Sequence, residues 1–526
     1  MASETKAERI ERIKHEKDGL DVISDIYRYA KSGEEIDPED IDRFKWYGIY
    51  TQNRNLQDAE DETQYYMLRV KLEGGYLNAK QVGVLGEISV QFARGSGDIT
   101  TRQDIQFHWL KIEDLPEILE RLSVVGLSVQ GASGDCPRNI VSCPVNGIDH
   151  AQIDDVRDVV LALNNLYRGN PDFSNLPRKF KIGVSGCNKH CIHHEVQDLA
   201  FTAVKNGDEL RFSVSVGGGQ ASNRRIGDHI GYVKRRDILK IAEAVARIYR
   251  DEGRRDNRSK ARLGHLVEQW GVERFASELE NESHVTLERY DGEPFTPYPR
   301  RSHFGVGASV KKGYNTIGCA LTSGRISGEK LLKLGRILDL YKAEGITLSA
   351  TQNFVILNVH TDATEPMIDT LKAVGFHPHP SVFEARTLAC TGLNFCKFAV
   401  SETKDLAIEV VEYLNHRFFD FDEPVSISIN GCPNSCAHPH IVDLGFVGAI
   451  VKRGEERLKG FDLIVGGHLE GEHSRFSVKT GIKVAADEVA PLVESLIREF
   501  EAGRSNSFGN FLWEKYANET AIPSSA

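Results

Sequence analysis

The stretch TTRQDIQFHWLKIEDLPEILERLSVVGL, residues 100–127, decides the fold because the chain repeats it as SATQNFVILNVHTDATEPMIDTLKAVGF, residues 349–376. Each copy reads as an extended run followed by an amphipathic helix that ends in Val-Gly and an apolar residue. Gly126 and Gly375, near the ends of the two copies, are 249 residues apart. Self-similarity at a fixed spacing predicts a duplicated chain.

Two further pairs of segments repeat in the same order. The segment VSGCNKHCIHHEVQDLAF at 184–201 matches INGCPNSCAHPHIVDLGF at 429–446. The tetrapeptide VGGG at 216–219 matches VGGH at 465–468. Three echoes in one order indicate two copies of one bipartite unit.

Each copy is predicted to begin as a small antiparallel α+β sandwich. In the first copy QYYMLRVKLEG (64–74) reads as a strand and NAKQVGVLGEISVQFARG (78–95) as a helix. Each copy then continues into a larger α/β region that carries a GCxxxC loop and a glycine-rich loop. The charge-rich stretch 237–284 reads as a helical connection between the copies.

Length, composition and charge narrow the class of protein. The 526 residues suffice for three or four domains, and 40% hydrophobic with 27% charged residues is ordinary for a globular protein. No apolar run approaches the length of a membrane span, and the polar N-terminus lacks the apolar core of a signal peptide. We therefore expect a cytoplasmic protein. The net charge of -11 argues against nucleic acid as a partner.

The cysteines are grouped in the way that metal-binding chains group them. Four lie in two loops of the second copy, as ACTGLNFC with Cys390 and Cys396, and as GCPNSC with Cys432 and Cys436. Four thiolates from two loops are what a [4Fe–4S] cluster requires. Zinc is the rival, but the five-residue spacing of the first pair fits structural zinc sites poorly.

This cysteine pattern, in a duplicated chain of this length, resembles the sirohaem nitrite and sulfite reductases, and ferredoxin-dependent bacterial sulfite reductases in particular. The resemblance runs from about residue 44 to about residue 500. It implies one [4Fe–4S] cluster on the four cysteines, with Cys436 also bridging to the sirohaem iron. It also implies five regions: an N-terminal helical segment and pocket strand (1–55), a first ferredoxin-like half (56–130), a first sirohaem-binding unit with helical linker (131–285), a second ferredoxin-like half (300–380) and a second unit with the cluster cysteines (381–526).

Four basic residues are candidates for binding an oxyanion. They are Arg102, Arg138, Lys179 and Lys181, and the resemblance places each where the family carries its substrate-binding cations. The alternation in Lys-Phe-Lys puts both lysines on one face of a strand. In the family a second lysine here is typical of sulfite reductases, whereas many nitrite reductases have Asn. The chain is therefore expected to reduce sulfite, with nitrite as the alternative.

Sirohaem carries eight carboxylates, so basic side chains and backbone N–H groups must surround it. The candidates are the two glycine loops and the arginines that follow them, namely Gly217, Gly218, Arg224, Arg225, Gly466, Gly467 and Arg475. Thr101 and Gln103 are weaker candidates.

No strand is followed by a convincing dinucleotide-binding glycine motif, so electrons are expected from another protein. The resemblance implies reduced ferredoxin, with a flavoprotein donor as the alternative, and a chain that acts as a monomer. An acidic donor would dock on a basic patch such as 234–236, 254–262 or 452–453. The remaining interpretations are a related monooxygenase of corrinoid biosynthesis and a non-catalytic electron carrier.

The first copy has its own four cysteines, in two pairs that form an imperfect version of the cluster motif: Cys136, Cys143, Cys187 and Cys191, with His193 and His194 adjacent. A second metal centre is one interpretation. Against it, Arg138 within the first pair is already assigned to the anion. A separate hypothesis is a covalent crosslink between Tyr50 and Cys136, because a tyrosine beside a thiol at a redox centre can become coupled.

Overall fold

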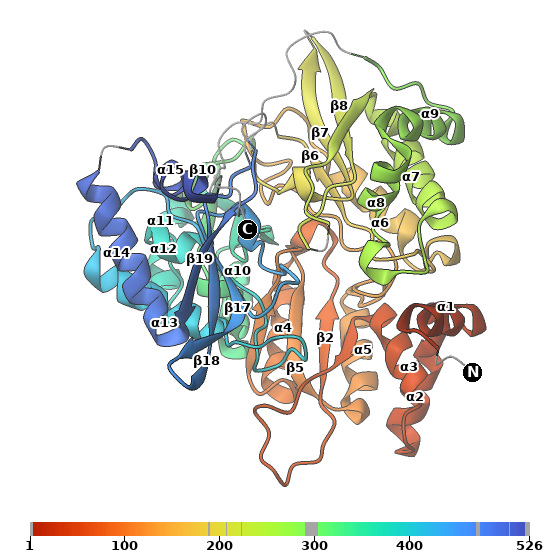
Figure 1. Ribbon diagram of the computed structural model, residues 1–526, viewed down its shortest axis with the longest axis horizontal. Coiled ribbons are helices and arrows are strands. Elements are labelled where there is room, and N and C mark those ends of the chain that lie inside the picture. Colours follow the sequence, from red (N-terminus) through yellow and green to blue (C-terminus); the bar gives the residue numbers. More distant parts are fainter. Residues whose placement is uncertain are drawn as a thin grey trace, which may run out of the picture.

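The computed structural model describes residues 4–187, 190–206, 208–221, 223–289, 303–469, 474–503 and 505–520. Its named strands form four sheets, two in ferredoxin-like halves and two in larger units. Figure 1 shows the first larger unit above the first half, with the second larger unit at the opposite side of the molecule. The predicted duplicated α+β chain is confirmed.

The first half is an antiparallel sheet covered by two helices. Its strands lie in the order β1 (Ile49–Thr51), β2 (Tyr66–Val70), β5 (Ile105–Leu110), β4 (Ser96–Ile99) and β12 (Arg325–Ser327). The helices are α4 (Ala79–Phe92) and α5 (Leu115–Val124). The side chain of Asn78 accepts the N–H of Gln81, and the Gln81 side chain bonds back to Asn78, so a capping box fixes the start of α4.

The second half repeats this arrangement. Its strands lie in the order β10 (Gly305–Ala308), β11 (Tyr314–Cys319), β14 (Phe354–His360), β13 (Gly345–Leu348) and β3 (Tyr76–Leu77). The helices are α10 (Gly328–Leu340) and α11 (Thr361–Ala373). Each ferredoxin-like half is therefore built from the same elements in the same order.

The two halves exchange an edge strand. β12 follows β11 in the chain but pairs with β4 of the first half, and β3 pairs with β13 of the second half. One hydrophobic core runs through both halves. The helices α4 and α10 approach so closely that a Cβ on Gly86 would lie 2.8 Å from the backbone nitrogen of Leu332. The halves thus form one body, because each sheet is completed by the other.

The first larger unit contains the sheet β6 (Ile182–Ser185), β7 (Leu199–Asn206), β8 (Glu209–Val216) and β9 (Asp228–Val233). β6 and β7 are parallel and the other pairs are antiparallel. In Figure 1 its helices gather on one side of the sheet: α6 (Arg157–Tyr167), α7 (Ile238–Glu252), α8 (Leu263–Trp270) and α9 (Val272–Ser283). The stretch that we expected to connect the copies is helical, and it packs into the core of this unit through residues such as Ile241 and Tyr249.

The second larger unit has the sheet β15 (Thr387–Ala389), β16 (Ile427–Asn430), β17 (Leu444–Arg453), β18 (Glu456–Val465) and β19 (Val478–Ala485). β15, β16 and β17 are parallel, and β18 and β19 complete the sheet in antiparallel fashion. Its helices are α12 (Val382–Arg386), α13 (Lys404–Arg417), α14 (Val489–Ala502) and α15 (Phe508–Thr520).

Three N-terminal helices brace the loop that carries Arg138. They are α1 (Lys6–Glu16), α2 (Ile23–Ser32) and α3 (Pro38–Arg43), and Ile13 and Ile26 are buried. Lys14 of α1 is buried and donates to the carbonyl of Leu176 at 3.1 Å. Its ammonium lies 3.6 Å from the carboxylate of Asp135. These buried contacts fix the chain just before Arg138.

A buried charge cluster joins the first half to the second larger unit. The carboxylate of Asp98 on β4 lies 3.5 Å from the ammonium of Lys404 on α13 and 3.3 Å from the guanidinium of Arg325 on β12. The Asp98 and Lys404 side chains are 3% and 1% exposed. Because unpaired charges are costly in such a place, each holds the other in position.

Candidate iron–sulfur and anion site

The four cysteines of the second unit lie on two loops that leave neighbouring parallel strands. Cys390 directly follows β15, while Cys432 and Cys436 follow β16. Parallel strands end at the same edge of a sheet, which brings both loops together. The N–H of Gly431 points at the sulfur of Cys390 over 3.2 Å. Cys396 is tied back through its N–H to the carbonyl of Gly392 at 3.0 Å.

The electrostatics of these thiols favour occupation by a metal cluster. Burial raises the pKa of Cys390 to about 12, and the charge of Cys436 adds to this. Burial also raises the pKa values of Cys396 and Cys432, and Cys436 again adds to both. The four sulfurs are therefore near enough to repel one another as thiolates. A cationic iron–sulfur core removes that cost, so the residues fit such a cluster.

Arg102 ties three segments of the first copy together. It lies between β4 and β5, and its guanidinium donates to the carbonyl of Asn139 at 3.1 Å and to that of Ile182 at 3.0 Å. A further bond of 2.8 Å reaches Oε1 of Gln197. The ferredoxin-like half is thus linked to the Arg138 loop and to β6 of the larger unit.

Arg138 and the two lysines meet on adjacent segments. The backbone N–H of Arg138 donates to the carbonyl of Phe180 at 2.9 Å, which places Arg138 beside the Lys-Phe-Lys sequence. Phe180 is fully buried in the core of the unit. The Nε of Arg138 is buried and has no hydrogen-bond partner within the described ranges. A buried donor without a partner fits a position where an anion binds.

The positive charges of this group act on one another. Burial lowers the pKa of Arg102 to about 10. The pKa of Lys179 falls to about 7 through burial and the charges of Arg262 and Arg138. Burial and the charge of Lys179 lower the pKa of Lys181 well below its usual value. An anion among these side chains relieves the repulsion, so the arrangement is electrostatically prepared for an anionic ligand.

Sequence reasoning missed Arg262 and Asp198 as part of this group. The guanidinium of Arg262 donates to the fully buried carboxylate of Asp198 at 2.7 and 3.1 Å. The same carboxylate accepts the backbone N–H of Lys181 at 2.7 Å. Arg262 belongs to the segment 254–262, which we interpreted as a candidate basic surface patch for an acidic donor. The only sequence signal was the density of arginines there.

The cations and the cluster cysteines come from opposite copies of the repeat and meet at one place. Oγ1 of Thr101 donates to the backbone carbonyl of Cys436 at 3.0 Å. The charge of Cys436 raises the pKa of Lys179 against the stronger lowering effects. The structure therefore brings together all of the predicted cations and the predicted bridging cysteine.

The glycine loop of the first copy packs against a neighbouring loop. A Cβ on Gly218 would lie 2.4 Å from the carbonyl oxygen of Glu195, and one on Gly217 would lie 2.4 Å from Nη1 of Arg225. Nη1 of Arg225 is buried without a hydrogen-bond partner in the described chain. Arg224 reaches Nδ1 of His440 in the other copy at 3.2 Å. Arg225 thus keeps Nη1 free for a carboxylate while its Nη2 pairs with Asp228, and Nδ2 of Asn223 is likewise buried without a partner among the described residues.

The corresponding loop of the second copy is held by contacts within its own unit. A Cβ on Gly467 would lie 2.4 Å from the carbonyl oxygen of His440, and Gly466 has a φ of 75°. The guanidinium of Arg475 donates to the carbonyl of Gly466 at 3.0 Å and stacks 4.5 Å over Trp513. Arg475 therefore has clear structural contacts besides any role toward a cofactor.

Gln103 joins the two copies through its side-chain amide. Its Nε2 donates to the carbonyl of Leu348 at 2.6 Å, and its Oε1 accepts the N–H of Ser142 at 2.8 Å. Gln352, its repeat counterpart, makes the equivalent contacts: its Nε2 donates to the carbonyl of Ile99, and its Oε1 accepts the N–H of Ala389. The role of Gln103 at a cofactor stays a prediction, since its amide is already bound to the backbone.

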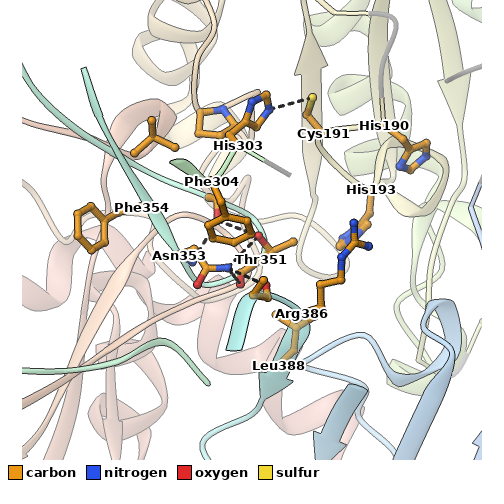
Figure 2. A pocket seen from close by; sticks show the side chains of 14 residues that line it. His190, Cys191, His193, His303, Phe304, Thr351, Asn353, Phe354, Arg386 and Leu388 are labelled. Atoms are coloured by element: carbon orange, nitrogen blue, oxygen red, sulfur yellow. Dashed lines mark hydrogen bonds between the residues drawn. The ribbon is translucent and has the colours of Figure 1, made fainter. Parts of the chain in front are cut away.

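Three cysteines of the first copy, Cys143, Cys187 and Cys191, lie together at a different place. A cavity of about 40 Å³ is lined by Cys191, His193, His303, Thr351 and Arg386 among others, and by none of the four predicted cations. Figure 2 shows His303 turned toward Cys191 across its upper edge. Thr351 is the repeat counterpart of Arg102. The cavity is therefore the counterpart of the anion site in the duplicated fold.

Tyr50 and Cys136 share one neighbour. The thiol of Cys136 donates to the carbonyl of Ser133 at 2.9 Å, and the Tyr50 hydroxyl bonds to the Ser133 side chain. Burial raises the pKa of Cys136 to about 11, whereas Arg138 and Arg69 lower that of Tyr50 against the effect of burial. A crosslink between the two side chains stays a prediction.

Comparison with known proteins agrees with this architecture. Residues 57–125 and 309–374 match the nitrite/sulfite reductase ferredoxin-like half domain, and residues 133–287 and 385–510 match the nitrite and sulphite reductase 4Fe-4S domain. No helix in the described ranges is long and apolar enough to cross a membrane. The fold and the site define an oxidoreductase with an iron–sulfur domain.

Relatives match over almost the whole chain. "Sulfite reductase [ferredoxin] 2" of Mycolicibacterium paratuberculosis is 36% identical, over 93% of this chain and 91% of the relative. "Ferredoxin--nitrite reductase" of Synechococcus elongatus is 33% identical, over 95% and 97%. The solved structure of Mycobacterium tuberculosis NirA protein superposes with a TM-score of 0.90 at 34% identity, covering 96% and 95% of the two chains. The chain belongs to the nitrite/sulfite reductase family.

Proposed function

We propose that this protein reduces sulfite to sulfide at a sirohaem whose iron is joined through Cys436 to a [4Fe–4S] cluster on Cys390, Cys396, Cys432 and Cys436. The observation that carries the proposal is the approach of the half-buried cations to Cys436, through Thr101 and Lys179. Sulfite, six electrons and six protons give sulfide and three waters. When bound, the sirohaem and the cluster supply the anion-binding iron and the single electrons.

The residues of the chain then have separable roles. Arg102 and Arg138 hold the oxygens of the anion, since a guanidinium suits paired oxyanion contacts. Lys179 and Lys181 hold the anion and pass protons to the oxygens that leave as water. A pKa of about 7 for Lys179 suits this transfer, because the lysine can both hold and release a proton near neutral pH. Arg262 and Asp198 position Lys181 through its backbone.

Arginines near the glycine loops are proposed to bind the carboxylates of the sirohaem. Arg225 supports this best, because its Nη1 is buried and unpartnered among the described residues. Arg224 and Arg475 are proposed for the same role beside their contacts with His440 and Gly466. The loops of Gly217, Gly218, Gly466 and Gly467 let these segments approach closely, with Thr101 and Gln103 at the border between the copies.

Sulfite is favoured over nitrite by the charge of the site. Sulfite is partly dianionic near neutral pH, whereas nitrite never carries more than one negative charge. The second lysine, Lys181, lies beside Lys179 and adds a further positive charge when a bound anion offsets the burial and the charge of Lys179 that otherwise lower its pKa. A ferredoxin-dependent nitrite reduction to ammonia is the second candidate, because relatives of both names match the chain at similar identity. The complete set of cations is what disfavours the corrinoid monooxygenase and the electron carrier.

Reduced ferredoxin is the proposed donor, and the surface beside Cys396 is its proposed docking site. Phe398 is 66% exposed next to the cluster loop. Lys397 reaches Oγ1 of Thr51 at 2.8 Å on the same surface. The basic segment 254–262 is less suited, because Arg258 and Arg262 turn inward to buried carboxylates.

The proposal is tested by steady-state turnover of the purified holoenzyme with reduced ferredoxin, with sulfide and ammonia as the measured products. A higher kcat/KM for sulfite than for nitrite supports it. A clear preference for nitrite would replace it with the second candidate and keep the site. A spectrum with cluster absorption but without Soret and red bands would contradict the proposal that the protein binds sirohaem.

A further inference from the structure

Three potential metal ligands of the first copy converge in the described chain. Nε2 of His303 lies 3.3 Å from Sγ of Cys191 and 3.5 Å from Sγ of Cys143. The three ligand atoms all lie within 4.8 Å of one another. The thiol of Cys187 forms a further hydrogen bond with that of Cys191. Cys143, Cys187 and Cys191 are 5%, 3% and 9% exposed, so the three cysteines are screened from solvent, while His303 is half-buried.

These cysteines occupy the positions of cluster cysteines in the duplicated fold. Cys187 and Cys191 precede Cys432 and Cys436 by 245 residues each, in loops that follow equivalent strands. The first copy therefore keeps the complete Cys-x3-Cys pair.

The third cysteine is fixed by strand register. Val141 pairs in parallel with Gly183, as Leu388 pairs with Ser428 in the second copy. In each copy the residue two positions after the first member of that pairing is a cysteine. Cys143 is thus the counterpart of a cluster cysteine, although its spacing in the sequence differs.

The fourth ligand comes from another part of the chain. No cysteine follows Cys143 at the spacing that separates the first two cluster cysteines of the second copy. His303, just before β10, supplies an imidazole instead. It can lie there because residue 318 is glycine: a Cβ on Gly318 would lie 1.5 Å from the carbonyl oxygen of His303. The first copy thus has an imidazole nitrogen beside its thiols where the second copy has a fourth cysteine.

The spacing of the ligand atoms fits a single ion better than a cluster. Zinc bonds of about 2.3 Å to sulfur and about 2.0 Å to nitrogen place tetrahedral ligands about 3.5 Å apart. The two measured separations of 3.3 and 3.5 Å agree with that value. In the part of the chain that the structure describes, the four cysteines of the second copy form no group as tight as this. A four-iron core needs its four cysteine sulfurs farther apart than the ligands of a single ion.

We propose that Cys143, Cys187, Cys191 and His303 bind one zinc ion with tetrahedral Cys3His coordination. Binding releases the thiol protons to solvent and leaves one net negative charge. The ion joins the loops of the first larger unit to the start of the second ferredoxin-like half. The ion holds the two copies together at the position that the internal repeat relates to the cluster cysteines of the second copy.

The site is tested on purified holoenzyme by elemental analysis and by X-ray absorption at the zinc edge, which the iron centres do not obscure. We expect about one zinc per chain, with three sulfurs at about 2.3 Å and one nitrogen at about 2.0 Å. The variants Cys191→Ser and His303→Ala should each lose at least about tenfold in zinc content, since a structural site needs its full ligand set. The matched control is Cys319→Ala, which removes a buried cysteine outside the group.

Several results would overturn the proposal. One is protein that contains no zinc as isolated and takes up none when the reduced protein is incubated with zinc chloride. A second is a peptide map with a disulfide between Cys143 and Cys191, which would make the group a redox pair. A third is a zinc spectrum with oxygen and nitrogen ligands only. The spectrum of the unmodified protein decides the matter even if a variant fails to fold.

Discussion

The hydroxyl of Thr101 donates to the backbone carbonyl of Cys436 over 3.0 Å, although 335 residues separate them in the chain. Thr101 precedes Arg102, and Cys436 is the last cysteine of the second unit. This bond joins the segment that carries the predicted anion-binding residue Arg102 to the loop of the predicted cluster cysteines. It places a proposed substrate cation one residue from a direct contact with the proposed bridging ligand.

Removing that bond should disturb the site without unfolding the protein. Thr101→Val keeps the shape of the side chain and removes the donor, so kcat/KM for sulfite should fall about fivefold, the equivalent of about 1 kcal/mol. Thr101→Ser keeps the donor and should retain activity. An unchanged kcat/KM in the valine variant, with the same electron paramagnetic resonance signal, would show that Thr101 does not position Cys436.

Lys181 should control the preference between the two anions. Lys181→Asn removes the lysine that adds a positive charge when the anion is bound, so kcat/KM for sulfite should fall by about tenfold or more while that for nitrite falls less. Both anions are assayed with the same reduced ferredoxin. Lys205→Asn, an exposed change on β7 of the same sheet, is the control and should alter neither value. Equal losses for both anions would contradict the charge argument.

The pH dependence should follow Lys179. Its pKa is lowered to about 7 by burial and by neighbouring arginines, so the lysine is protonated below that pH and neutral above it. Since the protonated form binds the anion and supplies the proton, kcat/KM should decline as the pH rises through about 7. In Lys179→Arg the positive charge persists, so this decline should move to higher pH. A decline at the same pH in both proteins would assign it to another group.

Removing the charge of Asp98 should lower the free energy of unfolding far more than removing that of Asp405, although both carboxylates pair with Arg325. Asp98→Asn leaves the buried Lys404 without its counterion, which should cost about 3 kcal/mol or more and lower the unfolding temperature. Asp405 also pairs with Arg325, at 2.6 Å, but is 51% exposed. Asp405→Asn should cost less than about 1 kcal/mol. Similar shifts in thermal unfolding for the two variants would contradict this.

The surface beside Cys396 should affect the donor and not the chemistry. Phe398→Ala removes an exposed ring, and Lys397→Gln removes a charge, so each should raise the KM for reduced ferredoxin severalfold. Turnover driven by a small chemical reductant should stay unchanged, because no protein has to dock. Phe419, which is 91% exposed at a distant helix end, provides the control Phe419→Ala. Equal losses with both reductants would point to damage at the cluster.

The sequence by itself was sufficient for everything that depends on local pattern and repetition. The spacing between Gly126 and Gly375 revealed the duplication, and apolar periodicity located α4 and β2. The loops with Cys390 and Cys436 were recognisable as an iron–sulfur motif because a cluster imposes its ligand spacing on short stretches of chain. The motif and the periodicity can be read in the sequence because each arises within a few tens of residues, and the duplication is visible because both copies keep such local patterns.

Only the tertiary structure decided which residues meet across the two copies. The exchange of β3 and β12, the bond from Thr101 to Cys436 and the approach of His303 to Cys191 all join residues far apart in the chain. The burial of Arg262 against Asp198 likewise turned an apparent surface charge into part of the site. Such contacts follow from how whole sheets pack, and the free energy of that packing is spread over many side chains, so no local pattern records it.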